Sequence, residues 1–233
     1  MREWNCLTSI EIAALDRRLP LIIPVGLVEA HGAHLPVSVD VATAEYFSRK
    51  IAENTGAILM PGITFGFADE MAGYPGTLGV RAETLMAVVE DLSSALCQQG
   101  FSRQIFLSGH GANKPVVELA FWKIWKKHPE LRAVCWNYWT EAGLTTIHHA
   151  DKGETEIAIA VGLPAQMEKA QTFHVKKPWY KIRSRSELDP LSGGVNGDPT
   201  QASAEEGAQM RDQVIRILSE KVSKVIAAEL SPL

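Results

Sequence analysis

The chain has 233 residues, of which 46% are hydrophobic and 21% are charged, a balance typical of a globular protein with a sizeable core. Its net charge of −4 gives no electrostatic reason to expect nucleic acid or an anionic membrane as a partner. No apolar run reaches the roughly 18 residues of a membrane helix, and the first residues show no signal pattern. Three cysteines without CxxC spacing predict free thiols in a reducing cytoplasm.

Strands and helices are predicted to alternate along most of the chain. Strands are predicted at 21–28, 57–61, 103–107 and 132–139, and the continuous apolar character of the first predicts that it is buried on both faces. Apolar residues at helical spacing predict helices at 8–18, 40–54, 82–99, 115–127, 154–161 and 202–229. A long glycine-rich loop at 62–79 and an irregular region at 163–200, with a β-excursion near 171–176, complete the chain. The pattern predicts one α/β domain over 1–233, a three-layer α/β/α sandwich with a mostly parallel central sheet.

The first predicted strand ends in a concentration of metal-ligand side chains. Glu29 and His31 are two residues apart, so their side chains point to the same side of an extended backbone. Asp40 follows nine residues after His31, and the turn that contains Gly32 and Pro36 can bring it back to the same place. Two carboxylates and an imidazole at the carboxyl end of a strand form the start of a divalent-metal site.

Two more predicted strands are followed by side chains of the same kind. These are His110 after the strand at 103–107, and His149, Asp151, Glu154 and Glu156 after the strand at 132–139. If the three strands are neighbours in a parallel sheet, all of these residues converge on one edge of it. That supply of ligands suffices for two metal ions, and the carboxylate of Asp40 is short enough to bridge them.

Other charged and imidazole side chains have plainer interpretations. His34 is predicted to orient a ligand through a hydrogen bond rather than to bind metal itself. His128 and His174 lie outside the glycine-rich turns and are predicted to be surface residues. Lys152 and Glu156 are predicted to be solvated or helix-terminal charges. A single histidine after a strand is also more often structural than a ligand.

Five sequence motifs follow one another between residues 20 and 210. They are Glu29-Ala-His31-Gly-Ala-His34-Leu35-Pro36 with Asp40, Glu70-Met71-Ala-Gly-Tyr74-Pro75-Gly76-Thr77, Ser108-Gly109-His110-Gly111-Ala112-Asn113, His149-Ala150-Asp151-Lys152-Gly153-Glu154-Thr155 and Gly194-Val195-Asn196-Gly197-Asp198-Pro199. Together they resemble the creatininase (creatinine amidohydrolase) family. The resemblance implies the three-layer α/β/α fold, two divalent metal ions per chain (Zn, Mn or Fe) and a homo-oligomer, often a hexamer.

The resemblance also implies roles for individual residues. One ion would be held by Glu29, Asp40 and His110, and the other by His31 and the bridging Asp40. In creatininase itself a glutamate two residues after the turn histidine completes the second site, but that position here is Ala112. Glu154 is nominated in its place. His149 is assigned proton transfer near the leaving group, and Glu154 is the alternative acid–base group.

These observations predict a metal-dependent hydrolase of the creatininase type that acts on a small molecule. The bond is an amide, in a cyclic amide, a formamide or a peptide-like compound, and Ala112 means that creatinine itself is not singled out. Glu70, Tyr74 and a tryptophan, Trp136 or Trp139, are predicted to line the substrate pocket, with core packing as the alternative for the tryptophans. The alternatives for function are a hydrolase of a cyclic ketone or lactone, and a non-catalytic metal-binding protein.

Overall fold

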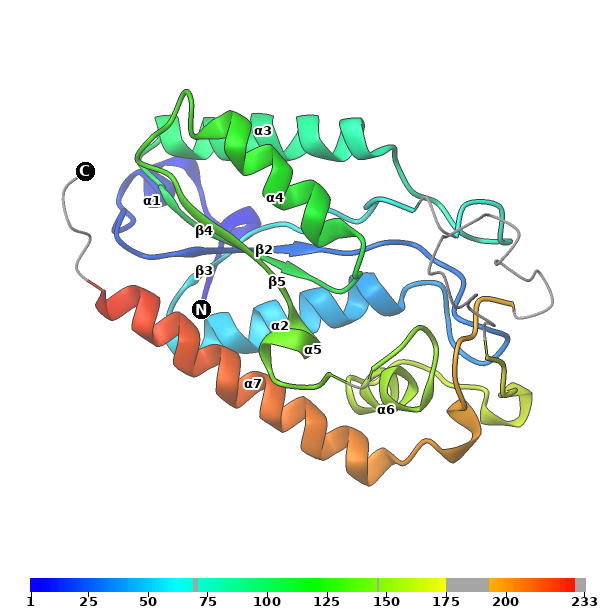
Figure 1. Ribbon diagram of the computed structural model, residues 1–233. Helices are drawn as coiled ribbons and strands as arrows, with labels where there is room; N and C mark the ends of the chain where they lie inside the picture. Colours follow the sequence, from blue (N-terminus) through cyan, green and yellow to red (C-terminus); the bar gives the residue numbers. More distant parts are fainter. Residues whose placement is uncertain (69–70, 146, 175–192, 229–233) are drawn as a thin grey trace.

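The protein is built around one parallel β-sheet (Figure 1), seen in a computed structural model that describes residues 1–68, 71–145, 147–174 and 193–228. The described strands lie in the order β1-β3-β2-β4-β5, and each pair of neighbours is parallel. Their bounds are β1 (Arg2–Glu3), β2 (Leu21–Val25), β3 (Ile58–Leu59), β4 (Arg103–Ser108) and β5 (Arg132–Asn137). Parallel neighbours need long crossover connections, which the intervening helices supply.

Helices cover both faces of the sheet, which confirms the predicted three-layer α/β/α sandwich (Figure 1). One face carries α3 (Ala82–Gln98) and α4 (Asn113–Ile124), and the other carries α2 (Val39–Thr55) and α7 (Ala204–Ala227). Successive side chains of a strand point to opposite faces, so Ile22 packs with the α2 and α7 cluster and Ile23 with the α3 and α4 cluster. The shorter helices are α1 (Ser9–Ala13), α5 (Tyr138–Glu141) and α6 (Lys152–Ala160).

Several predicted elements end earlier in the structure, among them the strand predicted at 21–28, which ends at Val25. The strand predicted at 132–139 ends at Asn137, and the two aromatic residues after it begin α5. The helix predicted at 8–18 ends at Ala13, because the Arg17 guanidinium takes the carbonyl oxygens of the last turn that a longer helix would use. The short edge strand β1 was not predicted. In the described part of the predicted excursion at 171–176, Phe173 forms a single antiparallel bridge with Gly197.

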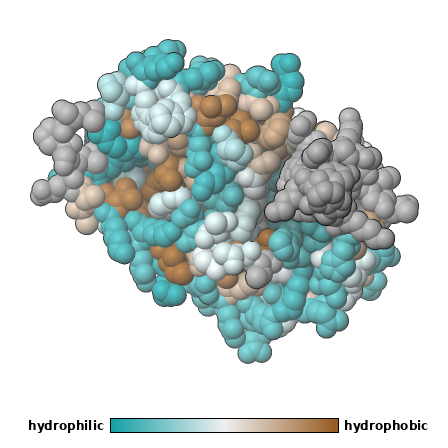
Figure 2. Space-filling view, viewed as in Figure 1, coloured by the Kyte–Doolittle hydropathy of each residue, from teal (hydrophilic) through white to brown (hydrophobic). Residues whose placement is uncertain are grey.

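The surface of the protein is mainly hydrophilic on the face seen in Figure 2, where hydrophobic residues form separate patches. Among the helices that the structure describes, none is both long and apolar enough to cross a membrane. The three cysteines are free thiols, with Cys6 exposed and both Cys97 and Cys135 buried.

Candidate metal centre

The loops after β2, β4 and β5 meet at the carboxyl end of the sheet, the end toward which β2 points in Figure 1. Val25 pairs with Ser108, and Ser108 pairs with Asn137, so the three strands end at the same level. The first turn of α2 packs directly on two of these strand ends. A side-chain carbon at Gly26 would lie 2.5 Å from the Val41 backbone, and one at Gly109 would lie 2.0 Å from the Asp40 carbonyl oxygen. Only glycine permits this close packing.

One group of candidate ligands joins the loops after β2 and β4 to α2. His110 Nδ1 lies 3.1 Å from Glu29 Oε2 and 3.3 Å from Asp40 Oδ2. The two carboxylates are almost completely buried, and the His110 side chain is 14% exposed. The donor atoms lie within 4.8 Å of one another, which suits a single divalent ion.

A second group lies on the other side of the Asp40 carboxylate. His31 Nε2 is 3.3 Å from Asp40 Oδ1 and 3.4 Å from Glu154 Oε2, and all three side chains are buried. Each oxygen of Asp40 therefore faces a different imidazole. Glu154, from the first turn of α6, adds a second carboxylate to this group. It is the residue nominated in place of the glutamate that creatininase has at the position of Ala112.

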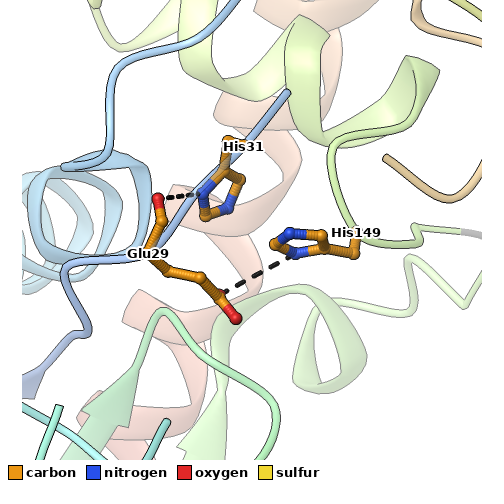
Figure 3. A group of neighbouring side chains, drawn as sticks. All are labelled: Glu29, His31 and His149. Carbon is orange, nitrogen blue, oxygen red and sulfur yellow. Dashed lines mark hydrogen bonds and ion pairs between the residues drawn. The ribbon is translucent and has the colours of Figure 1, made fainter. Parts of the chain in front are cut away.

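His149 lies beside both groups. Its Nε2 donates to the Ala30 carbonyl at 2.8 Å, which leaves Nδ1 as the nitrogen that faces the carboxylates. Figure 3 shows the Glu29 carboxylate turned toward His149, and the distances from Nδ1 are 3.8 Å to Glu29 Oε2 and 3.9 Å to Glu154 Oε2. The His149 ring is 4.4 Å from the His31 ring, and its side chain is 26% exposed. His149 therefore lies between the buried carboxylates and solvent.

The charges in this centre are strongly coupled. Burial alone would lower the pKa of His110, but Asp40 and Glu29 outweigh it and raise that pKa to about 10. Burial likewise opposes charge on His31, yet Glu154 and Asp40 raise its pKa well above the usual value. Burial would raise the pKa of Asp40, but His31 and His110 hold it well below the ordinary range. Without a metal, protons on the imidazoles are what compensate the buried carboxylates.

Three buried atoms in the centre, Glu29 Oε2, His31 Nε2 and Asp40 Oδ2, face charged partners at 3.1–3.4 Å but form no well-aligned hydrogen bond. Buried polar atoms are nearly always satisfied, so three orphans directed at the same small space need an explanation. A cation between the carboxylates and imidazoles would satisfy all of them. The donor set, imidazole nitrogen with carboxylate oxygen, fits Zn²⁺, Mn²⁺ or Fe²⁺.

The loop before α6 is held by Asp151, the N-cap of that helix. Its carboxylate accepts hydrogen bonds from the backbone amides of His148 at 2.8 Å and Glu154 at 3.0 Å. Between them Ala150 adopts a left-handed conformation (φ 48°), and its amide donates to the Glu154 carboxylate. One buried side chain thus fixes the loop that carries both His149 and Glu154.

Two further residues tie the loops together, and sequence analysis did not single them out. Asn113 donates from Nδ2 to the Gly26 carbonyl at 3.1 Å and accepts at Oδ1 from the Phe67 amide at 2.9 Å. Thr77 Oγ1 accepts from the Ala30 amide at 3.0 Å. Both residues lie inside motifs that carry the family resemblance. Their place in these motifs is the sequence feature that could have identified them.

The remaining predicted site residues lie outside the two groups. His34 is buried and its Nε2 hydrogen-bonds the Thr155 hydroxyl at 2.9 Å, next to Glu154 on α6. Trp136 is buried in the core, and Trp139 packs partly buried beside the turn that follows β4. Tyr74 is half-buried, and Glu70 lies outside the described residues.

One prediction about charge was wrong. Glu156, expected to be solvated, is 2% exposed. Its carboxylate accepts from the Ser203 amide at 2.9 Å and pairs with Lys152 at 3.0 Å. The reason is that α7 packs across α6 at this point, so the side chain joins two helices instead of facing water.

Two curated relatives show where sequence similarity lies. The creatinine amidohydrolase of Pseudomonas putida is 33% identical over 98 residues, a match that covers 40% of this chain and 38% of that protein. The mycofactocin precursor peptide peptidase of Mycolicibacterium smegmatis is 26% identical over 222 residues, which covers 90% of this chain and 87% of that protein.

Solved structures with the same fold carry creatininase names. A crystal structure of creatinine amidohydrolase (creatininase) superposes with a TM-score of 0.85 at 21% identity, covering 97% of this chain and 98% of the other. A zinc–zinc form of a creatininase variant and a manganese form of creatininase each have a TM-score of 0.84 at 21% identity and cover 95% of this chain and 97% of the other. At this identity the likeness shows the fold.

The family model described as creatininase, creatinine amidohydrolase, matches residues 5–222. This range includes all five motifs and every described strand from β2 to β5. The chain therefore belongs to the creatininase family.

Proposed function

We propose that this chain is a hydrolase that cleaves an amide carbon–nitrogen bond with two divalent metal ions. The observation that carries the proposal is the placement of Asp40, whose two carboxylate oxygens each face a separate imidazole–carboxylate group. Glu29, Asp40 and His110 would hold one ion, and His31, Asp40 and Glu154 the other. The zinc–zinc and manganese forms of structurally similar creatininases support this choice of metals.

The ions, when bound, would polarise the carbonyl of the substrate and lower the pKa of a water toward neutrality. The chain supplies the proton transfer. His149 is fixed by its hydrogen bond to the Ala30 carbonyl, and its free Nδ1 would accept the proton of the attacking water and pass it to the leaving nitrogen. The carboxylates of Glu29 and Glu154, at 3.8 and 3.9 Å, would stabilise the imidazolium formed in between. Glu154 is the second acid–base candidate, and His34 would keep it in place through Thr155.

The proposed substrate is a small molecule with a cyclic amide, formamide or peptide-like bond. Tyr74 and Trp139, with Glu70, are proposed to line its pocket. A peptide-like bond stays in this set because the Mycolicibacterium relative, a peptide peptidase, matches along 90% of the chain. We also propose that the chain forms a homo-oligomer in the cytoplasm. Light scattering on the purified chain would test the oligomeric state.

A metal-loading experiment tests the function. The chain is stripped with a chelator, reloaded with Zn²⁺ or Mn²⁺, and assayed on cyclic amides, formamides and short peptides, with a lactone for comparison. We expect about two ions per chain and hydrolysis of an amide that depends on them. Two bound ions without hydrolysis of any compound would favour the non-catalytic alternative, and preferential lactone cleavage would favour the other hydrolase class.

Histidine variants separate catalysis from metal binding. His149→Ala should abolish most hydrolysis and keep both ions, because this side chain lies at the edge of both groups. His148→Ala is the matched control, since the adjacent residue is exposed and hydrogen-bonds Asp151 through its backbone. Equal losses in the two variants would show that the loop, and not the His149 imidazole, is responsible.

A further inference from the structure

A third cluster of metal-ligand side chains lies far from the metal centre. It consists of Cys97, His128 and Glu130, whose donor atoms lie within 4.8 Å of one another. His128 Nδ1 is 3.1 Å from Glu130 Oε1. Cys97 lies in the last turn of α3 before β4 begins, and the other two precede β5. Because the strands are parallel, this cluster is at the amino end of the sheet, opposite the metal centre.

The turn that carries two of these ligands is held by its own backbone. The His128 amide donates to the Ile124 carbonyl at 2.8 Å, and the Leu131 amide donates back to the His128 carbonyl at 3.1 Å. The Arg132 guanidinium donates to the Pro129 carbonyl at 3.0 Å and to the Leu131 carbonyl at 3.3 Å. A backbone hydrogen bond and His128 lower the pKa of Glu130, and the charge of the same guanidinium adds to this effect. Both guanidinium bonds hold the backbone of the turn. The imidazole and the carboxylate are therefore presented on a fixed support, which lowers the entropic cost of binding a ligand.

The chemistry of the cluster matches zinc. Sulfur, imidazole nitrogen and carboxylate oxygen are the three protein donors that Zn²⁺ takes in tetrahedral sites. A thiolate and a carboxylate would together neutralise the charge of the ion, and the displaced thiol proton would go to solvent. Gln104 Nε2 lies 3.7 Å from Cys97 Sγ and donates to it, the kind of contact that orients a metal ligand from outside.

Access to the cluster is from one side. Cys97 is buried at 7% exposure, whereas the His128 side chain is 15% exposed and the Glu130 side chain 49% exposed. An ion could therefore enter past Glu130, and a water would complete its coordination on that side. His128 was expected to be a plain surface residue, but it lies partly buried against its two potential co-ligands.

We propose that Cys97, His128 and Glu130 form a zinc site that ties the end of α3 to the turn before β5. It is a structural site, separate from the metal centre and independent of the proposed hydrolysis. In the metal centre each candidate ligand is a histidine or a carboxylate, so a sulfur signal belongs to this site alone.

Cobalt spectroscopy on the full chain tests this directly. Co²⁺ bound by a thiolate gives an intense charge-transfer absorption in the near ultraviolet, which imidazole and carboxylate ligands do not give. We expect this band in the native chain at saturating Co²⁺, its loss in Cys97→Ser, and its displacement by Zn²⁺. Cys135→Ser and Cys6→Ser are the matched controls, one buried and one exposed, and both should keep the band.

A second variant and a second measurement keep the test valid if Cys97→Ser does not fold. His128→Ala, at the surface side, should weaken the band without removing a core side chain. In an Asp40→Ala background, Zn²⁺ should raise Tm, and adding His128→Ala should reduce that rise. No charge-transfer band in the native chain, or a band that survives Cys97→Ser, would overturn the zinc site. Neither result would bear on the metal centre.

Discussion

The side chain of Asp151 offers the sharpest test of how the metal centre is assembled, because it touches no ligand atom of either group directly. Asp151→Ala removes two hydrogen bonds to backbone amides, at 2.8 and 3.0 Å. Loss of the helix cap costs about 1 kcal/mol, and the unpaired amide of His148 costs about 1 kcal/mol more. For a chain of this size the sum of about 2 kcal/mol lowers Tm by roughly 4–8 °C. Without these bonds the loop should no longer hold Glu154 in place. The affinity for the second ion should therefore fall by roughly 10-fold or more.

The assay measures Tm together with the number of bound ions per chain after dialysis against graded Zn²⁺. Asp151→Asn should keep the helix cap and lose the bond from the His148 amide, because asparagine has a single acceptor oxygen, so it should lower Tm by about half as much as Asp151→Ala. Ser203→Ala is the control for capping alone, since Ser203 caps α7 by accepting from the Glu206 amide at 3.4 Å. It should lower Tm by about half as much and leave both ions bound. If Asp151→Ala bound both ions with native affinity, the positioning role would be refuted.

Three other changes probe the centre itself. Asp40→Ala should lose both ions together, and metal analysis that found one site intact would contradict the bridge. His149→Gln should lower kcat by about 10²- to 10⁴-fold with both ions retained, a result that steady-state kinetics and metal analysis would check. Because the pKa of metal-free His110 is raised to about 10, this imidazole is protonated at pH 7 and must lose its proton to the buffer when it binds a metal. Apparent metal affinity should therefore rise as pH increases from 7 toward 10, and calorimetry in buffers of different ionisation enthalpy should show proton release; buffer-independent heats would contradict this.

Sequence patterns predicted the layers of the fold because the spacing of apolar residues indicates which faces of a strand or helix are buried. A strand such as Leu21–Val25 is apolar on both faces, which only a sheet covered by helices on both sides can satisfy. The same reasoning failed where a segment is buried equally well as a strand or as a helix. Tyr138 and Trp139 continue an apolar run, yet they begin α5, where Tyr138 packs against Phe47 of α2.

The convergence of Glu29, His31, Asp40 and His110 was foreseeable because parallel strands place their following loops together. Glu154 was foreseeable from the gap that Ala112 leaves. The role of Glu156 was not, because its burial depends on where α7 crosses α6, a long-range contact that local spacing does not encode. The approach of Cys97 to the turn before β5 was not predicted for the same reason, since His128 lies 31 positions after Cys97.

The packing of α2 on the ends of β2 and β4 has an evolutionary consequence. At Gly26 and Gly109 there is no room for any side chain, so the spacing between the strand ends and Asp40 is fixed by backbone contact alone. The peptide that carries the Asp40 carboxylate is thus positioned by these backbone contacts and not by the Tyr74 side chain. A lineage could therefore change side chains around Tyr74 while Asp40 keeps its place, provided that Thr77 continues to hold the Ala30 amide.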